Sequence, residues 1–233
     1  MTIHGVAAIQ RTGVAESPHG KKEIAVHLLS SSFTQGQRIP AQYAFCAQDP
    51  AQHVRMSSNR NPHLRWTGVP STAKSLVLIC VDTDVPTRPD DVNKEGRSVP
   101  ADLPRTNFHH WVMVDIAPAI TEIAAGSTSA GITARGKREP KGPAGTRQGI
   151  NDYTSWFAGD ADMEGQYFGY DGPCPPWNDA LLHHYHFVLY AIDLKRCPVE
   201  GAFTGPQVEE AIARHVLAES RLTGTYALNP AVK

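Results

Sequence analysis

The sequence predicts an all-β fold with one flanking helix near the C-terminus. Pro and Gly account for 18 and 19 of the 233 residues, and this frequency favours short strands joined by turns over long helices. The main apolar runs are also rich in β-branched and aromatic residues, as is typical of strands. The length lies near the upper limit for one all-β domain, so we expect a single domain over 1–233, with 1–22 as an irregular N-terminal extension.

Helical periodicity is concentrated near the end of the chain. Gly205 and Pro206 open a segment whose apolar residues fall on one side, so we expect a helix over 206–222 that packs on the sheet. The run TGTYAL that follows is expected to add a last strand. Three of the earlier strand candidates are nearly continuously apolar, which indicates that both faces are covered. Four segments are expected to form the central sheet: 24–30, 75–82, 111–116 and 184–193.

Charge and composition exclude several classes of partner. Lys and Arg total 22 against 23 acidic residues, so no large field of one sign is available to hold a nucleic acid or an anionic membrane surface. The first residues lack a basic start followed by an apolar stretch, and no segment is apolar enough to span a bilayer. These features predict a cytoplasmic protein with no nucleic-acid partner and no integral membrane segment.

The four cysteines form no C-x-x-C pair, which disfavours a zinc ribbon or a redox motif. In a cytoplasmic protein, Cys46, Cys80, Cys174 and Cys197 are expected to be reduced and mostly buried.

Two polar segments are expected to be loops. Residues 92–108 are polar and precede a strand, which is typical of a loop over a site. Residues 131–149 are basic, rich in Gly and have almost nothing to bury, so they predict a mobile surface loop.

Side chains that could do chemistry gather in four clusters, each beside a predicted strand: 82–86, 108–111, 172–176 and 183–187. Asp82 ends an apolar run, so its carboxylate is delivered to the end of the sheet, where functional groups are common. Asp82 and Asp84 can equally cap a turn before Pro86, because Asp and Pro are ordinary turn residues.

Strand alternation in the second cluster separates the two histidines. It places Phe108, His110, Val112 and Val114 on one face and His109 on the other. The histidines are therefore not expected to share one pocket. A single histidine at a strand start is more often structural than a ligand.

In the fourth cluster, the same alternation presents His183 and Tyr185 together. Imidazole can be charged near neutral pH, and the phenol is a strong neutral donor, so the pair suits an anion. Asp82 beside them would favour the charged imidazole, or bind a protonated phosphate oxygen or an amine. The set therefore fits a phosphate or a zwitterionic headgroup.

The third cluster, GPCPP, is expected to be a stiff wall, because its prolines fix the backbone and remove donors. The N–H groups of Gly172 and Cys174 could face an anion. A rigid turn without a function is the alternative.

Taken in order, these pieces resemble the phosphatidylethanolamine-binding protein family, also called the Raf kinase inhibitor family, and particularly its bacterial and archaeal branch. The resemblance covers roughly residues 24–195. It is carried by NPHLRWTGVPSTAKSLVLICVDTDVP, the His-His pair, GINDY, and GPCPP followed by HHYHFVLYAID.

The resemblance implies a Greek-key β-sandwich with a C-terminal helix. It also implies an anion pocket formed by Asp82, His110, His183 and Tyr185, and bordered by Pro86, Phe108, Gly172, Cys174 and Pro175.

The chain also departs from the family pattern. DTDVP replaces D-P-D-A-P, which is expected to change the turn at Pro86, and Phe108 stands where many relatives have Trp. The aromatic segment from Tyr153, which includes Trp156, is longer than is usual in the bacterial branch. It is expected to reshape or cover the mouth of the pocket.

The resemblance implies a non-enzymatic protein that binds a small anionic group, such as phosphate, a phosphate ester or a phospholipid headgroup. A protein kinase or protease would then be the regulated partner, and a homodimer is plausible. We expect no cofactor, no metal and no catalytic residue.

One alternative is a metal-assisted hydrolase using Asp82, His110 and His183, although H-E-x-x-H, G-x-S-x-G and phosphate-loop motifs are absent. Another is a protein-interaction module with a vestigial pocket, docking through 153–170 or the basic loop.

Overall fold

Antiparallel strands dominate the computed structural model, which describes residues 25–232. The predicted N-terminal extension, 1–22, and Ile24 of the first predicted strand lie outside the described residues. The helical elements are η1 (Ala41–Tyr43), α1 (Tyr153–Trp156) and α2 (Gly205–Ile212). The strands are β1 (His27–Leu29), β2 (Cys46–Asp49), β3 (His53–Met56), β4 (Leu64–Thr67), β5 (Ser75–Pro86), β6 (Arg105–Ile116), β7 (Glu122–Ile123), β8 (Arg147–Gln148), β9 (His183–Ile192) and β10 (Val216–Tyr226).

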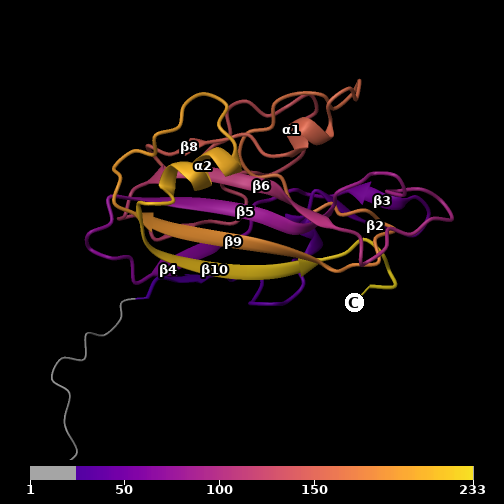
Figure 1. Ribbon diagram of the computed structural model, residues 1–233, viewed down its shortest axis with the longest axis horizontal. Helices are drawn as coiled ribbons and strands as arrows, with labels where there is room; N and C mark the ends of the chain where they lie inside the picture. The colour runs from indigo at the N-terminus through magenta and orange to yellow at the C-terminus, as the bar shows by residue number, and fades with distance from the viewer. Residues whose placement is uncertain (1–24, 233) are drawn as a thin grey trace, which may run out of the picture.

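A five-stranded sheet forms the centre of the molecule, in the order β10-β9-β5-β6-β8 (Figure 1). β5 lies between β9 and β6, so strands distant in sequence are neighbours, as a Greek-key connection requires. A second sheet has the order β1-β4-β7, and β2 and β3 form a separate hairpin.

The central sheet is covered on both faces. Leu78 and Phe187 face a core shared with Leu28 and Trp66 of the three-stranded sheet. Val77 and Val112 face a second core that α2 closes with Val208, Ile212 and their neighbours. Figure 1 shows α2 lying over β6. Coverage on both faces explains why these strands read as continuous apolar runs.

The predicted all-β fold with a helix near the C-terminus is confirmed, and three of the four predicted central strands lie in the central sheet. The prediction for 24–30 was wrong in its placement, because β1 pairs with β4 in the smaller sheet. β10 takes the remaining central position beside β9. β6 also begins earlier than predicted, so the end of the 92–108 segment is strand.

The predicted helix over 206–222 was too long. α2 ends at Ile212, and β10 begins at Val216. From Val216 to Arg221 burial alternates residue by residue, which is the period of a strand. Pairing along nearly the whole of β9 overrides the helix propensity of the Ala, Leu, Glu and Arg residues in this stretch.

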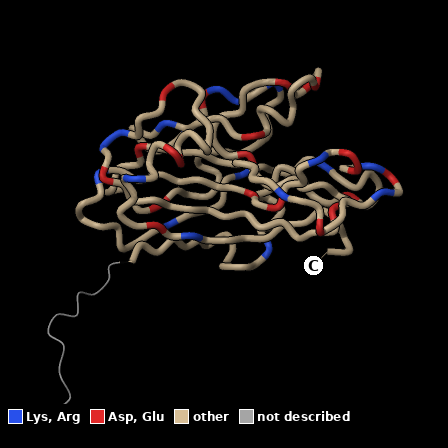
Figure 2. The backbone as a smooth tube through the Cα atoms, viewed as in Figure 1, with Lys and Arg blue, Asp and Glu red and all other residues tan. Residues whose placement is uncertain are grey.

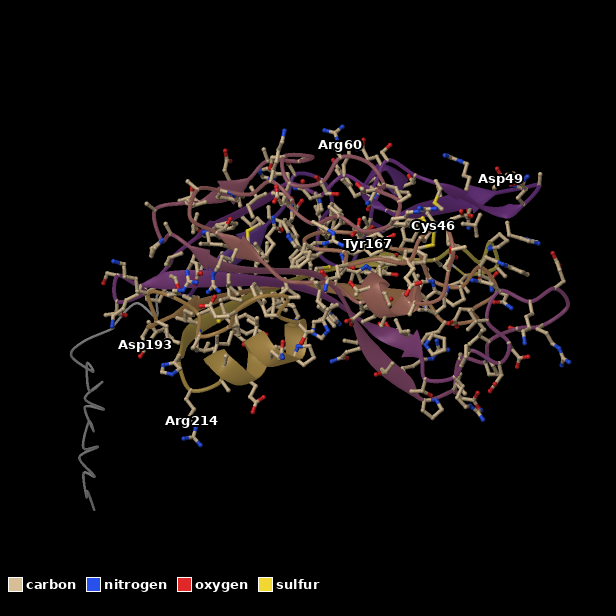
Figure 3. All side chains as sticks on the ribbon, turned by 90° about the horizontal axis from the view of Figure 1, so that it is seen from above. Cys46, Asp49, Arg60, Tyr167, Asp193 and Arg214 are labelled. Atoms are coloured by element: carbon tan, nitrogen blue, oxygen red, sulfur yellow. A yellow bond between two sulfur atoms is a disulfide. The ribbon has the colours of Figure 1, made fainter. Side chains whose placement is uncertain are left out.

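The prediction of four reduced cysteines was wrong for two of them. Cys46 and Cys174 form a disulfide, whereas Cys80 and Cys197 are free and buried. The sulfur atoms can be followed beside the Cys46 label in Figure 3. Disulfides are typical of oxidising compartments. The bond therefore weighs against a cytoplasmic location, which stays a prediction.

The basic segment 131–149 lies largely at the surface, but two of its side chains make hydrogen bonds and ion pairs with the rest of the domain. Lys137 contacts the buried carboxylate of Asp171, and Arg147 binds Asp115 together with the carbonyl oxygens of Cys197 and Val199. The predicted surface loop describes most of this segment, but its end, Arg147–Gln148, forms β8 and pairs with β6 in the central sheet. Within residues 25–232, no helix has the length and apolarity needed to cross a membrane.

Candidate functional site

Three neighbouring strands bring the predicted site residues together at one end of the central sheet. In the β-ladder, Asp82 of β5 stands opposite Phe108 of β6 on one side and Tyr185 of β9 on the other. His110 lies two residues after Phe108 in β6, and His183 lies two residues before Tyr185 in β9. Residues separated by about a hundred positions in the chain therefore become neighbours through strand pairing.

These residues line a cavity of about 480 Å³. Its walls include aromatic residues of α1, the disulfide Cys46–Cys174 and the loop before β6. The predicted loop over a site, 92–108, contributes Val92 and Asn93 as well as residues of β6. Of the nine predicted site residues, eight line the cavity: Asp82, Pro86, Phe108, His110, Cys174, Pro175, His183 and Tyr185.

Gly172 is the exception. Its N–H donates to Asn59 Oδ1 over 2.8 Å, so this amide is not free to face an anion. A Cβ at this position would collide with the backbone carbonyl of Tyr43. Glycine is needed here because two backbone segments approach closely.

A β-bulge at His110 sets its direction. Cys80 pairs with Trp111, and the next residue, Val81, pairs with His109, so the ladder skips His110. His110 therefore lines the cavity, whereas Val112 and Val114 belong to the core beneath α2. The prediction that His110 shares a face with those valines was wrong, because simple alternation does not hold across a bulge.

The two histidines do lie in different environments, as predicted. His109 is outside the cavity lining, with its backbone N–H 2.6 Å from Asp152 Oδ2 and its Nε2 3.7 Å from Glu209 of α2. Burial acts to lower the pKa of His109, but Asp152 and Glu209 raise it to about 9.

His183 is the centre of a buried chain of alternating charges. Its Nδ1 lies 2.7 Å from Asp82 Oδ2, and its Nε2 lies 3.1 Å from Asp179 Oδ2. Arg105 donates two hydrogen bonds to the Asp179 carboxylate, at 2.6 and 3.0 Å. Burial acts to lower the pKa of His183, but the charge of Asp82 and hydrogen bonds to Asp179 and Asp82 raise it to about 9. The imidazolium thus donates to one carboxylate on each side.

Asp82 is held from two directions. Oδ2 accepts the His183 hydrogen bond, and Oδ1 accepts the backbone N–H of Asp84 over 2.8 Å. Asp82 therefore caps the turn, as one interpretation predicted, and it also lines the cavity. Asp84 lies on the outer face, where its carboxylate accepts hydrogen bonds from the backbone N–H and the ring of His184.

His110 is held as a neutral imidazole with one defined tautomer. Nδ1 lies 2.8 Å from the carbonyl oxygen of Asp171, and because a carbonyl only accepts, Nδ1 carries the proton. Burial lowers the pKa of His110. Its Nε2 then has a lone pair and no hydrogen bond with any described residue.

The support for His110 is a network around Asp171. The carboxylate accepts hydrogen bonds from Asn59 at 2.6 Å, from Asn151 at 2.8 Å and from Lys137 at 3.1 Å. Its side chain is only 2% exposed, so the Lys137 ammonium balances a buried charge.

Tyr185 supplies an unused donor. Within residues 25–232 its hydroxyl is buried without a hydrogen-bond partner. Burial, and after it the negative charge of Asp82, raises the pKa of this phenol well above its ordinary value, so the proton stays on the oxygen. The ring packs edge-on against His110 with centroids 5.1 Å apart. Buried hydroxyls normally find a partner, so this unpaired donor is a candidate contact for a ligand in the cavity.

Sequence reasoning missed the supporting residues. Asn151, Asp152 and Tyr153 belong to the GINDY phrase, which carried the resemblance but received no role. Tyr153 lines the cavity and donates its hydroxyl hydrogen to the carbonyl of Gly172 over 2.8 Å. Asn59 and Lys137 carry no local signal, because their partner Asp171 is distant in the chain.

The geometry does not favour the metal-assisted alternative. Both ring nitrogens of His183 already bind carboxylates, and Nδ1 of His110 is committed to a carbonyl. No group of three or more His, Cys, Asp or Glu side chains among the described residues is arranged to hold a metal ion.

The fold and the cavity define a β-sandwich protein whose cavity, at one end of the central sheet, contains a group of buried polar side chains. Residues 29–227 match the model of the phosphatidylethanolamine-binding protein family, so the chain belongs to that family.

Curated relatives are a UPF0098 protein of Chlamydia muridarum, 32% identical, and one of Methanothermobacter thermautotrophicus, 31% identical; each alignment covers 86% of this chain and 98% of the relative. UPF0098 protein YbhB of Escherichia coli is 26% identical over 86% of this chain and 99% of its own.

Two solved structures have the same fold. A putative phosphatidylethanolamine-binding protein homolog from Chlamydia trachomatis has a TM-score of 0.57 and 28% identity, and covers 87% of this chain and 97% of its own. YbcL of Escherichia coli, described as a member of the mammalian family, has a TM-score of 0.63 and 24% identity, with coverage of 87% and 98%.

Proposed function

We propose that this protein binds a small anionic group, phosphate or a phosphate ester, in the cavity without converting it chemically. The observation that carries the proposal is the Tyr185 hydroxyl, which is buried close to His110; in the part of the chain that the structure describes, neither this hydroxyl nor Nε2 of His110 has a hydrogen-bond partner. One group donates and the other accepts, so together they match a singly protonated phosphate: Tyr185 donates to an unprotonated oxygen, and His110 accepts from the P–OH.

The charges of the site favour the same form of the ligand. The negative charges of Asp82 and Asp179 are balanced by the positive charges of His183 and Arg105, and that of Asp171 is balanced by Lys137. This polar end of the cavity and its supporting residues therefore have almost no net charge. A fully ionised phosphate would meet the Asp82 carboxylate, and like charges at close range are unfavourable. His183 acts through Asp82, because both of its ring nitrogens are already hydrogen-bonded. Regulation of a kinase or protease and pairing into a homodimer stay predictions from the resemblance.

Isothermal titration calorimetry with inorganic phosphate tests the proposal. Tyr185→Phe removes one hydroxyl that has no hydrogen-bond partner among residues 25–232, so folding should be preserved. A hydrogen bond to a charged group contributes about 1.5–3 kcal/mol, so the dissociation constant should rise roughly 10- to 100-fold.

Tyr190→Phe is the matched control, because Tyr190 lies on the same strand but packs toward the core under α2. Its dissociation constant should equal that of the unmodified protein. Phosphate binding that is unchanged by Tyr185→Phe would count against the site. The absence of phosphate binding to the unmodified protein would remove the proposal.

A further inference from the structure

The disulfide Cys46–Cys174 forms part of the cavity wall near the mouth. Both cysteines line the cavity, and Cys46 stands opposite Met56 in the β2–β3 ladder. Met56 and Trp156 also line the cavity, yet they are 58% and 50% exposed, so these side chains lie at the mouth. Cys174 itself is only partly buried. A small thiol can therefore approach the disulfide through the cavity, and accessible disulfides are typically the labile ones.

One side of the disulfide is continuous with a segment that orients the site. Cys174 follows Asp171 and Gly172, whose carbonyl oxygens accept hydrogen bonds from His110 Nδ1 and from the Tyr153 hydroxyl, each over 2.8 Å. A hydrogen bond weakens when its acceptor moves out of line, so the position of this segment sets the orientation of both rings. The disulfide thus restrains the backbone that holds the proton of His110 on Nδ1.

The other side of the disulfide is the base of the β2–β3 hairpin, whose tip is fastened away from the cavity. The ring of His53 stacks on Trp177, with centroids 3.9 Å apart and planes 8° apart, and its Nε2 lies 2.6 Å from Glu95 Oε1. The backbone of His53 has a φ of 63°, in the left-handed region that residues with a Cβ disfavour. These contacts therefore hold the tip in place against an unfavourable backbone conformation.

The base of the hairpin depends more on the disulfide. The N–H groups of Phe45 and Cys46 both donate to the carbonyl oxygen of Pro173, over 2.9 and 3.2 Å. Two backbone hydrogen bonds to one acceptor restrain the chain less than a covalent bond does. Reduction should therefore loosen the end of the hairpin that lines the cavity, while the tip stays in place.

Charge does not select the reductant. Among the described residues that line the cavity, none is Lys or Arg. Figure 2 shows Lys and Arg interspersed with Asp and Glu along the chain, without a large region of one sign in this view. The matching reductant is therefore a small uncharged dithiol.

We propose that the Cys46–Cys174 disulfide is a redox switch of the cavity: the oxidised form holds the site in its binding geometry, and the reduced form loosens it. The inference rests on the proposed function and adds its regulation. One thiolate of the dithiol attacks a sulfur of the disulfide, and the second thiol of the same reductant resolves the mixed disulfide. Two electrons pass to the protein, which gains two thiols, and the dithiol becomes a cyclic disulfide.

Calorimetry with inorganic phosphate tests the inference on the full chain, first oxidised and then reduced with dithiothreitol and desalted under nitrogen. Reduction should raise the dissociation constant about three- to tenfold, because binding then has to order the loosened segment. Reoxidation with glutathione disulfide should restore the original value. Iodoacetamide should label Cys46 and Cys174 of the folded protein only after reduction, and should leave the buried Cys80 and Cys197 unlabelled.

The double variant Cys46→Ser with Cys174→Ser is the matched control. Its affinity for phosphate should equal that of the reduced protein, and dithiothreitol should not change it further, which separates this bond from the free thiols and from the reagent. The circular dichroism of the β-sheets should be the same in all forms. If the variant does not fold, the oxidised and reduced forms of the unmodified protein still give the comparison.

The outcomes separate this inference from the proposed function. If phosphate binds in a Tyr185-dependent manner and equally well to the oxidised and reduced forms, the switch is overturned and the phosphate site stands. A disulfide that resists dithiothreitol in the folded protein also overturns the switch, as does a loss of the β-sheet signal on reduction, because the bond then serves only stability. If phosphate binds to neither form, both proposals fail together.

Discussion

The buried histidines predict a steep loss of stability as the pH rises above neutral. The pKa of His183 is about 9 in the folded protein, against 6.5 for the free side chain, and that of His109 is also about 9. The folded state therefore holds protons that the unfolded state releases near pH 6.5. Their stabilisation is complete below that pH and is lost as the pH rises through 9.

The size of the effect follows from the two pKa values. Between pH 6.5 and 8.5 each of these histidines should lose about 2 kcal/mol of stabilisation, and the pair about 4 kcal/mol. His110 and His186 have lowered pKa values, so their contribution runs in the opposite direction and is nearly complete by pH 7.5. The series should stop at pH 8.5, because burial raises the pKa of the free thiols of Cys80 and Cys197, which adds a further loss at higher pH.

Urea unfolding at half-unit pH steps gives the measurement. The free energy of unfolding of the unmodified protein should fall across this range. His183→Gln and His109→Gln should each remove about half of the slope, so each variant is the control for the other. An NMR titration of the ring carbons gives a second reading that needs no variant, with the His183 midpoint near pH 9. Parallel profiles for the unmodified protein and His183→Gln, or a His183 midpoint near 6.5, would refute the reasoning.

Three further predictions concern the supports of the site. Lys137→Met leaves the Asp171 carboxylate buried without its cation, so the free energy of unfolding should fall by about 3–5 kcal/mol in a denaturant titration. Lys141 is exposed on the same segment, so Lys141→Met should change the free energy of unfolding by about 0.5 kcal/mol or less. Equal losses for the two variants would contradict the role of Lys137. The disulfide spans 128 residues, so its reduction should lower the free energy of unfolding by about 2–5 kcal/mol, and an unchanged urea midpoint in dithiothreitol would oppose this. Gly205→Ala places a Cβ against the His109 ring and should cost about 1–3 kcal/mol; a melting temperature equal to that of the unmodified protein would show that the contact can relax freely.

Much of the site was predictable because its signals are local. The apolar run of β5 ending in Asp82 and the alternation of His183 and Tyr185 each need only a few adjacent residues to be recognised. Strand period alone placed His183 and Tyr185 on one face, and burial in the structure agrees. The resemblance then supplied the order of the phrases, and eight of the nine residues predicted for the site line one cavity.

The tertiary structure decided whatever depends on distant partners. The stretch Val216–Arg221 has helix-forming residues, yet it is a strand because β9 offers an open edge along its length. His110 turns toward the cavity because the β5–β6 ladder skips it, and no sequence period records that bulge. Asp171 receives Asn59 from 112 positions away, and Cys46 meets Cys174 across 128. Local sequence specifies periodicity and turns, whereas contacts between distant side chains exist only after the sheets have packed.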